Sequence, residues 1–421
     1  MSPRAPRGSA PAEGDAAGRS RLKEKATAVG RALLLANVSL YALSFMMQAP
    51  VLPFLTKSFG ADMVAYGRLQ TWFSLLQTVS GLAAGPVMDA FGPRLMLLAS
   101  YASSAVCYAM TGSAQGMLLL YASRVPTLLQ HAIMATRTVV TDSTSEADRA
   151  RALGYVGVAY GIGMSVGPAL GGVLSGGGDL RLASWVAAAV SLASLLSLAL
   201  FLPYEAPRGG DGGGLPDRRP LKMGDLGRVA MLHGVPSLLT VKFLTGMATS
   251  IFQSAFPLFI SSHFKLDARG SGLVMSFSGV VGILTQAFVI GPATRRMDDK
   301  RIVQHCSLLM LASLAGLGAC DTVPQMLACL VPFYVASSLL STVNTAQLTK
   351  AAPQDSGTVN SIDMSVGSAC RMLSPTIASY TLHKAGYRSV CGLGSGSLLL
   401  LLLLLRVKVV DAAPPTRDRS L

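Results

Sequence analysis

Four charged side chains lie inside long apolar stretches of this sequence: Arg124, Lys242, Asp363 and Arg371. A charge at membrane depth costs free energy unless it is paired or faces water or a ligand, so each is a candidate for binding or moving a polar solute. Asp363 could carry a proton, pair with Lys242 or cap a helix at the membrane interface. Lys242 could instead extend its ammonium toward that interface. Arg124 either lines a cavity or pairs with a carbonyl or hydroxyl group.

Three uncharged polar residues extend this candidate set. His131 follows Arg124 by seven residues, which places both side chains on one face of a continuous helix. Its imidazole can titrate near physiological pH, so it is either a proton relay or a packing residue with satisfied hydrogen bonds. Gln70 and Gln77 have the same spacing, and they either line a cavity or form hydrogen bonds between helices.

Twelve apolar segments of roughly twenty residues must position these side chains, and each is long enough as a helix to cross a hydrocarbon core of about 30 Å. Of the 421 residues, 51% are hydrophobic and 13% are charged, and the mean hydropathy is +0.49. Because lipid offers the backbone no hydrogen-bond partners, we predict an all-α membrane protein with twelve transmembrane helices. The predicted spans are residues 32–55, 69–88, 95–111, 117–140, 152–174, 182–202, 236–261, 272–290, 303–320, 326–348, 359–382 and 390–410.

The distribution of basic residues predicts the orientation of these spans. Of the 35 Lys and Arg residues, 25 fall in the segments that share a side with both tails, 7 fall on the other side, and 3 lie within spans. By the positive-inside rule, both termini and the central loop are cytoplasmic. We predict a location in the plasma membrane or in an intracellular membrane.

Two pairs of proline residues indicate that the chain is duplicated. Pro86 recurs as Pro292, 206 residues later, and Pro168 recurs as Pro375, 207 residues later. Two matches at nearly one offset indicate parallel six-helix halves that rock around a central site. The predicted parts are a disordered basic cytoplasmic tail (1–31), an N-terminal six-helix half (32–202), a cytoplasmic linker (203–235), a C-terminal six-helix half (236–410) and a cytoplasmic tail (411–421).

Other classes of function lack support in this sequence. We recognise no nucleotide-binding loop, catalytic triad or metal-ligand cluster, and the six cysteines lack CxxC spacing. We therefore predict no enzyme activity, no cofactor and no metal. The net charge of +14 follows from the one-sided loops and does not indicate a nucleic-acid partner.

The residues between spans 2 and 3 resemble a loop of the major facilitator superfamily, with the pattern Gly-x-x-x-Asp-Arg/Lys-x-Gly-x-Arg/Lys-Arg/Lys. Gly85, Asp89, Gly92 and Arg94 match this pattern, and two of its basic positions are apolar here. The resemblance implies that Asp89 latches the cytoplasmic side shut by meeting the positive N-terminal end of span 11. The alternative is a turn with charged flanks.

Two further segments resemble gating elements of the same superfamily. Gly167 and Pro168 begin a Gly-Pro-x-x-Gly-Gly sequence in span 5, similar to a signature of facilitators that act as antiporters. Close packing of small residues is the alternative. Asp142 and Arg149, between spans 4 and 5, resemble the acidic cytoplasmic turn of the superfamily, and a solvated charge cluster is equally consistent with them.

Span 4 resembles the drug antiporters of the superfamily, whose pattern Leu-x-x-x-Arg-x-x-x-Gly is matched by Leu120 and Arg124 but not by Leu128. Several stretches also resemble an outlying group of solute carrier family 22: residues 68–73, 122–126, 139–142, 239–243, 275–277 and 289–291. This resemblance implies a small-molecule substrate and protons as partners within the bilayer, in a proton-coupled antiport of lipophilic organic cations.

The charges within the spans leave the substrate open. Three cations and one carboxylate favour an anion over a cation. An organic anion or neutral metabolite carrier is therefore an alternative, and a non-transporting membrane scaffold or regulator that kept the fold is another.

Overall fold

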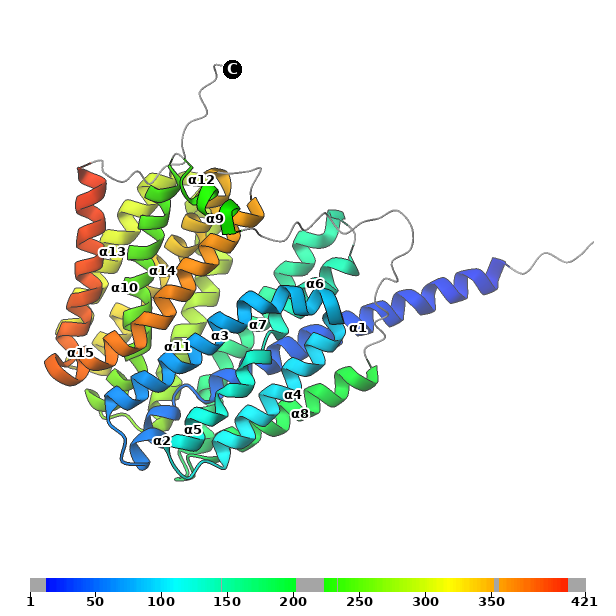
Figure 1. Ribbon diagram of the computed structural model, residues 1–421, viewed down its shortest axis with the longest axis horizontal. Helices are drawn as coiled ribbons and strands as arrows, with labels where there is room; N and C mark the ends of the chain where they lie inside the picture. The colour runs from blue at the N-terminus through cyan, green and yellow to red at the C-terminus, as the bar shows by residue number, and fades with distance from the viewer. Residues whose placement is uncertain (1–12, 145, 202–222, 233, 352–355, 408–421) are drawn as a thin grey trace, which may run out of the picture.

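The computed structural model describes residues 13–144, 146–201, 223–232, 234–351 and 356–407, and its regular elements there are all helices (Figure 1). The first lobe contains α1 (Glu13–Met47), α2 (Leu52–Ser58), α3 (Met63–Phe91), α4 (Pro93–Gly112), α5 (Met117–Ser123), the 3-10 helix η1 (Val125–Leu129), α6 (Ala132–Asp142), α7 (Glu146–Ser175) and α8 (Leu182–Phe201). A short helix, α9 (Met223–Ala230), precedes the second lobe.

The second lobe contains α10 (Val235–Ser262), α11 (Ala268–Leu284), the π-helix η2 (Thr285–Val289), α12 (Ile290–Arg296), α13 (Asp299–Ala319), α14 (Val323–Ala351) and α15 (Ser356–Arg406). Corresponding helices of the two lobes begin alike. Asp62 accepts a hydrogen bond from the Ala65 backbone N–H at the start of α3, and Asp267 accepts one from Gly270 at the start of α11. These caps satisfy backbone donors that a helix start leaves open.

Nine helical segments among the described residues are long and apolar enough to cross a membrane. One of them, Ser361–Arg406, covers both the eleventh and the twelfth predicted spans. The second predicted span corresponds to α3, and the fourth to α5, η1 and α6 together. The all-helical membrane fold is confirmed, and this arrangement is consistent with twelve crossings.

The prediction of a continuous fourth span was wrong. The α-helix ends at Ser123, a 3-10 helix follows, and the next α-helix begins at Ala132. Pro126 accounts for the break, because it lacks the N–H needed for an α-helical bond and its ring crowds the preceding turn. Arg124 and His131 therefore do not share a face of one regular helix.

Gly386 lets α15 turn back on itself without a loop. Its φ of 75° is a left-handed conformation that glycine adopts at little cost, and the helix on either side forms two limbs. The limbs correspond to the two last predicted spans. The eleventh and twelfth crossings are consequently joined by a sharp turn at one residue.

The predicted tail and linker differ in part from the structure. α1 begins at Glu13, inside the segment expected to be disordered, where Ala, Glu, Lys and Leu favour a helix. The last part of the predicted linker forms α9, whose Val229 packs in one apolar cluster with Leu238, Leu348 and Val359. Residues 1–12, 202–222 and 408–421 lie outside the described residues.

The two lobes touch at one end and diverge toward the other, which carries α6, α9 and α12 (Figure 1). At the closed end, α7 packs on α11 and α3 packs on α15. A β-carbon added to Gly172 would lie 2.5 Å from the carbonyl oxygen of Ala268, and one added to Gly279 would lie 2.7 Å from Ser165 Oγ. These two distances belong to the contact between α7 and α11. In the contact between α3 and α15, the Thr71 and Thr376 hydroxyl oxygens lie 2.8 Å apart. We call these two contacts the closed-end seam.

Large apolar side chains cover much of the outside. Leu82 and Leu118 are 75% and 86% exposed, which is unfavourable in water but favourable in acyl chains. The surface is therefore suited to a bilayer, and the multi-pass membrane prediction holds.

We expect Gly172→Leu to destabilise the closed-end seam, because its side chain would meet the α11 backbone. Overpacking of this kind costs about 1–3 kcal/mol, and each 1 kcal/mol lowers the melting temperature by roughly 2–4 °C in a domain of about 150–250 residues. Fluorescence-detected thermal unfolding of the purified protein would measure this. Gly157→Leu on the same helix is the control, since a β-carbon there meets no atom within 4 Å. Equal melting temperatures of the two variants would contradict the claim that close packing at Gly172 stabilises the closed-end seam.

Candidate transport site

Lys242 and Asp363 form an ion pair inside the second lobe. Lys242 Nζ lies 2.9 Å from Asp363 Oδ1 and 3.3 Å from Oδ2, and the two side chains are only 13% and 11% exposed. Each residue lies seven positions after the start of its helix, α10 or α15, and thus about 10 Å from that end. Of the alternatives open for Asp363, the structure has the pair with Lys242 rather than an interfacial cap.

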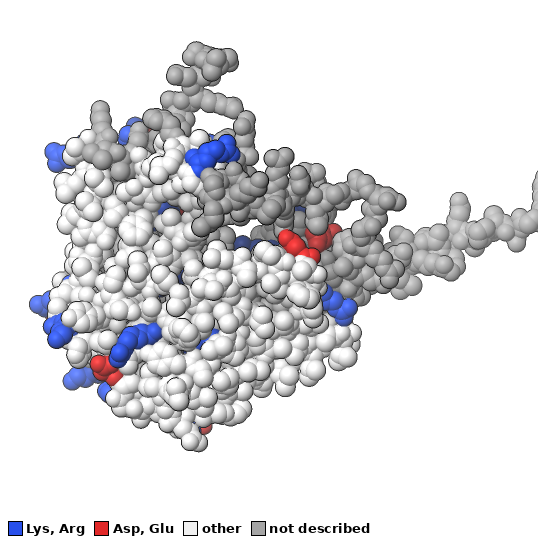
Figure 2. Space-filling view, in the orientation of Figure 1, with Lys and Arg blue, Asp and Glu red and all other residues white. Residues whose placement is uncertain are grey.

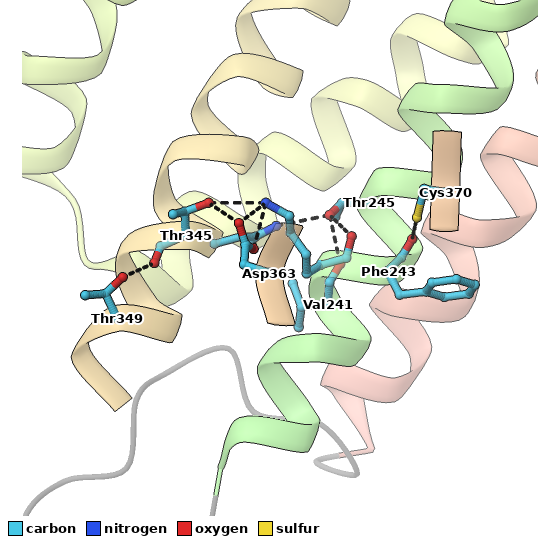
Figure 3. A network of polar contacts seen from close by, with 9 residues as sticks. Val241, Phe243, Thr245, Thr345, Thr349, Asp363 and Cys370 are labelled. Carbon is cyan, nitrogen blue, oxygen red and sulfur yellow. Dashed lines mark hydrogen bonds and ion pairs between the residues drawn. The ribbon is translucent and has the colours of Figure 1, made fainter. Parts of the chain in front are cut away.

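Thr345 joins this pair to a third helix, α14 (Figure 3). Lys242 Nζ donates a hydrogen bond to Thr345 Oγ1 at 3.2 Å, and this hydroxyl donates to Asp363 Oδ2 at 3.1 Å. The neighbouring Asn344 donates to Thr245 Oγ1 at 3.0 Å, which adds a second link between α14 and α10. The ion pair therefore binds α10, α14 and α15 together at one level.

Arg371 lies on the side of α15 that contacts the first lobe. It is exposed, it donates a hydrogen bond to Ser368 Oγ at 3.1 Å, and no described carboxylate lies within 4 Å of it. Arg371, Pro375 and Ser379 follow one another at intervals of four, on one face of α15. Pro375 and Ser379 lie against Gly67 of the first lobe. Arg371 is one turn from that contact in the direction in which the lobes diverge.

Arg124 is buried within the first lobe, with 7% of the residue exposed. Both terminal nitrogens lie 3.4 Å from Gln48 Oε1, and Nη2 lies 3.5 Å from Thr111 Oγ1. Its Nε has no hydrogen-bond partner among the described residues. The guanidinium charge is thus held by an amide and a hydroxyl, and not by a described carboxylate.

Side chains from α3 donate hydrogen bonds to backbone carbonyls of the broken fourth span. Trp72 Nε1 donates to the Tyr121 carbonyl at 3.2 Å, and Gln77 Nε2 donates to the Thr127 carbonyl at 3.0 Å. The broken helix leaves carbonyls free that must find partners in a membrane. Gln77 therefore makes the interhelical hydrogen bond that was one of its two predicted roles.

Gln70 and His131 also make local contacts. Gln70 Nε2 donates to Tyr66 Oη at 2.9 Å within α3. His131 Nε2 lies 2.9 Å from Ser80 Oγ, and its backbone N–H donates to Ser100 Oγ at 3.1 Å. His131 thus contacts different partners from Arg124.

The predicted gating residues lie at two levels. Asp89 is exposed at the end of α3, Gly92 has a φ of 82° where α4 follows, and Arg94 Nη2 lies 3.4 Å from the Ala199 carbonyl. These residues are at the divergent end, and the latch between Asp89 and α15 stays a prediction. Asp142 and Arg149, on either side of the turn between α6 and α7, are also exposed at that end.

Gly167 and Pro168 lie near the closed-end seam instead. A β-carbon on Gly167 would lie 2.7 Å from the Leu43 carbonyl oxygen of α1, and Pro168 lies against Gly272 of α11. The structure thus shows the close packing that was one interpretation of this sequence, and its role in gating stays a prediction.

Sequence reasoning missed Gln48, Thr111 and Thr345, which supply the polar partners of the buried cations. Gln48 carried a usable signal, because an amide inside an apolar span needs a partner. Thr111 and Thr345 carried little, since a threonine in a helix can satisfy its own hydroxyl on a carbonyl four residues back. Thr111 does so with Cys107.

Comparisons with known proteins agree on one family. The family described as Major Facilitator Superfamily matches residues 34–235 and 238–420. Mouse solute carrier family 22 member 18 is 30% identical over 356 residues, which cover 81% of this chain and 86% of the relative. Tetracycline resistance protein, class G, from Vibrio anguillarum is 33% identical over 278 residues, 64% of this chain and 68% of the relative.

A solved structure shows a similar fold. The crystal structure of the human organic anion transporter MFSD10 (TETRAN) aligns with a TM-score of 0.64 at 21% sequence identity. The alignment covers 89% of this chain and 98% of that chain. At this identity the likeness supports the arrangement of helices in two lobes.

We predict that Lys242 and Asp363 are strongly coupled in stability. Lys242→Gln or Asp363→Asn alone should lower the free energy of unfolding by about 3–5 kcal/mol, because each leaves a buried charge or a buried partner unpaired. The double variant should lose less than the sum of the two. Thermal and denaturant unfolding in detergent would measure this coupling.

The exposed pair Lys350–Asp299, at 2.8 Å, is the matched control. Its coupling should be about 0–1 kcal/mol, because solvent screens it. If both cycles give the same coupling, the Lys242–Asp363 pair does not hold the three helices together.

Proposed function

This chain belongs to the Major Facilitator Superfamily, and from that premise we propose that it is a secondary active transporter that exchanges a lipophilic organic solute for protons by alternating access. It is a multi-pass membrane protein of a transporter family and not an enzyme. The observation that carries the proposal is the buried Lys242–Asp363 pair, which joins three helices of one lobe at membrane depth.

Alternating access is supported by the way the lobes meet. Small residues close one end, and the lobes diverge toward the other end, at which α1 begins and α15 ends (Figure 1). Figure 2 shows the surface notched between the lobes on that side. With both termini cytoplasmic, as the basic residues predict, this conformation opens toward the cytoplasm. The candidates for residues that close one side of the transporter or open the other are then Asp89, Asp142, Arg149 and Pro168.

Asp363 is the candidate proton carrier. When ionised, it balances the Lys242 ammonium and accepts a hydrogen bond from Thr345. A proton on Asp363 would remove that attraction and leave the Lys242 charge exposed to a low-dielectric site, so the packing of α10 against α15 would weaken. Proton binding is thereby linked to rearrangement of the second lobe. His131 stays a second candidate for a relay in the first lobe.

Lipophilic organic cations are the first substrate class we propose. The resemblance to solute carrier family 22 implies them, and a relative named as a tetracycline resistance protein is compatible with an amphipathic drug-like solute.

Organic anions are a second candidate, favoured by Arg371. Arg371 lies on the side of α15 that contacts the first lobe, and no described carboxylate lies within 4 Å of it, so a negative solute between the lobes would gain a partner there. The structural relative titled as an organic anion transporter agrees with this possibility. A non-transporting scaffold is the remaining alternative, and saturable flux would exclude it.

Asp363→Asn should uncouple transport from the proton gradient. In proteoliposomes with an imposed pH gradient, the wild-type protein should accumulate substrate, and the variant should lose accumulation while still exchanging substrate between the two sides. The amide cannot take up and release a proton over this range. Asp299→Asn, in an exposed pair, should leave accumulation unchanged. Intact accumulation in Asp363→Asn would refute the proton role.

Arg371→Gln should reveal the sign of the substrate. If anions are carried, the variant should raise KM for an organic anion at least tenfold, because a charge-assisted contact is worth about 1.5–3 kcal/mol. If cations are carried, KM for an organic cation should stay equal or fall. Arg295→Gln on α12, also exposed, is the control. An unchanged KM for both classes would remove Arg371 from the transport site.

A further inference from the structure

A groove on the outside of the second lobe lies away from the ion pair and from the space between the lobes. It runs between α10 and the two limbs of α15 and has a volume of about 550 Å³. The lining residues are Leu244, Thr381, Ser389, Gly392, Leu393, Gly396, Ser397 and Leu400. From Ser389 to Leu400 the helix rises about 16 Å, close to half of a hydrocarbon core of about 30 Å. The groove therefore has the length of one leaflet.

Two glycines create this groove. A β-carbon on Gly392 or Gly396 would meet no atom within 4 Å, so nothing inside the protein fills the space that their side chains would take. Gly394 points the other way, and its β-carbon would lie 3.0 Å from Leu314. Leu393 and Leu400, beside the glycines, are 42% and 48% exposed. The groove is thus apolar and opens toward lipid.

Two basic residues lie at the closed-end mouth of the groove. Lys384 lies one turn beyond Thr381 on the first limb, and Arg388 lies one turn before Gly392 on the second. Both are exposed, and neither forms an ion pair with a described carboxylate. Asp321 lines a neighbouring recess of about 280 Å³ with Arg388, without pairing to it. The mouth therefore carries two basic side chains that form no ion pair with a described carboxylate.

We propose that this groove binds an anionic phospholipid of the leaflet at the closed end. Its phosphate would lie between Lys384 and Arg388, and one acyl chain would follow Gly392 and Gly396 toward Leu400. The charge of the mouth selects an anionic headgroup, and the length and apolar lining of the groove suit an acyl chain.

A second copy of the protein fits the same surface less well. In a symmetric membrane dimer the axis is normal to the bilayer, so residues at one depth meet their equivalents. Lys384 and Arg388 of both copies would then approach one another, and like charges in a weakly screened site repel. The basic mouth thus favours a lipid over a helix packed through the glycines.

Native mass spectrometry of the full-length protein tests this proposal directly. The protein, released from detergent, would be titrated with dioleoyl phosphatidylglycerol or with dioleoyl phosphatidylcholine, which share their acyl chains. We expect at least tenfold tighter retention of phosphatidylglycerol. Lys384→Gln/Arg388→Gln should remove this preference. Lys57→Gln/Arg181→Gln, an exposed and a half-buried cation on the closed-end side of the first lobe, should keep it.

A second variant tests the groove itself. Gly392→Leu/Gly396→Leu should fill the groove and reduce the binding of both lipids, while size-exclusion chromatography verifies that the protein stays folded. Equal retention of the two lipids by the wild-type protein, or an unchanged preference in Lys384→Gln/Arg388→Gln, would overturn the proposal. A stable dimer that the double leucine variant disrupts would also overturn it, since a second copy would then occupy the groove.

Discussion

A charge inside a bilayer has to be compensated, and this requirement organises the interior of the protein. Lys242 is compensated by Asp363 and Thr345, which brings three helices of the second lobe to one point. Among the described residues, Arg124 is compensated only by the dipoles of Gln48 and Thr111 in the first lobe. Arg371 is exposed and donates a hydrogen bond to Ser368, with no ion pair to a described carboxylate. The three basic residues therefore differ in how easily a solute or a proton can change the contacts that compensate their charge.

The two lobes are held together by a different kind of contact. At the closed-end seam, glycines and hydroxyl residues let α7 approach α11 and α3 approach α15 without any ion pair among the described residues. Such contacts depend on shape, and separating them leaves few unpaired charges in the membrane. Charge compensation is thus kept within each lobe, and the interface between lobes stays free to open.

Much of the fold could be predicted from hydropathy and charge, because membrane helices need long apolar segments. The break in span 4 could not, although Pro126 was visible. Prolines occur in intact membrane helices as well, and whether the chain bends or changes to a 3-10 helix depends on partners such as Gln77. For the candidate site, the charged residues could be named but not paired. Lys242 and Asp363 are 121 residues apart in the chain, and only their packing shows that they meet.

The hydrogen bonds from α3 to the broken span have a mechanical consequence. Trp72 and Gln77 donate hydrogen bonds to backbone carbonyls on either side of Arg124. Thr71, next to Trp72, contacts the other lobe. A displacement of α3 as the lobes part would pull on the one stretch of span 4 that lacks a continuous α-helical ladder. The position of the Arg124 guanidinium would then depend on whether the lobes are closed or open, because these two hydrogen bonds connect α3 to the chain on either side of Arg124.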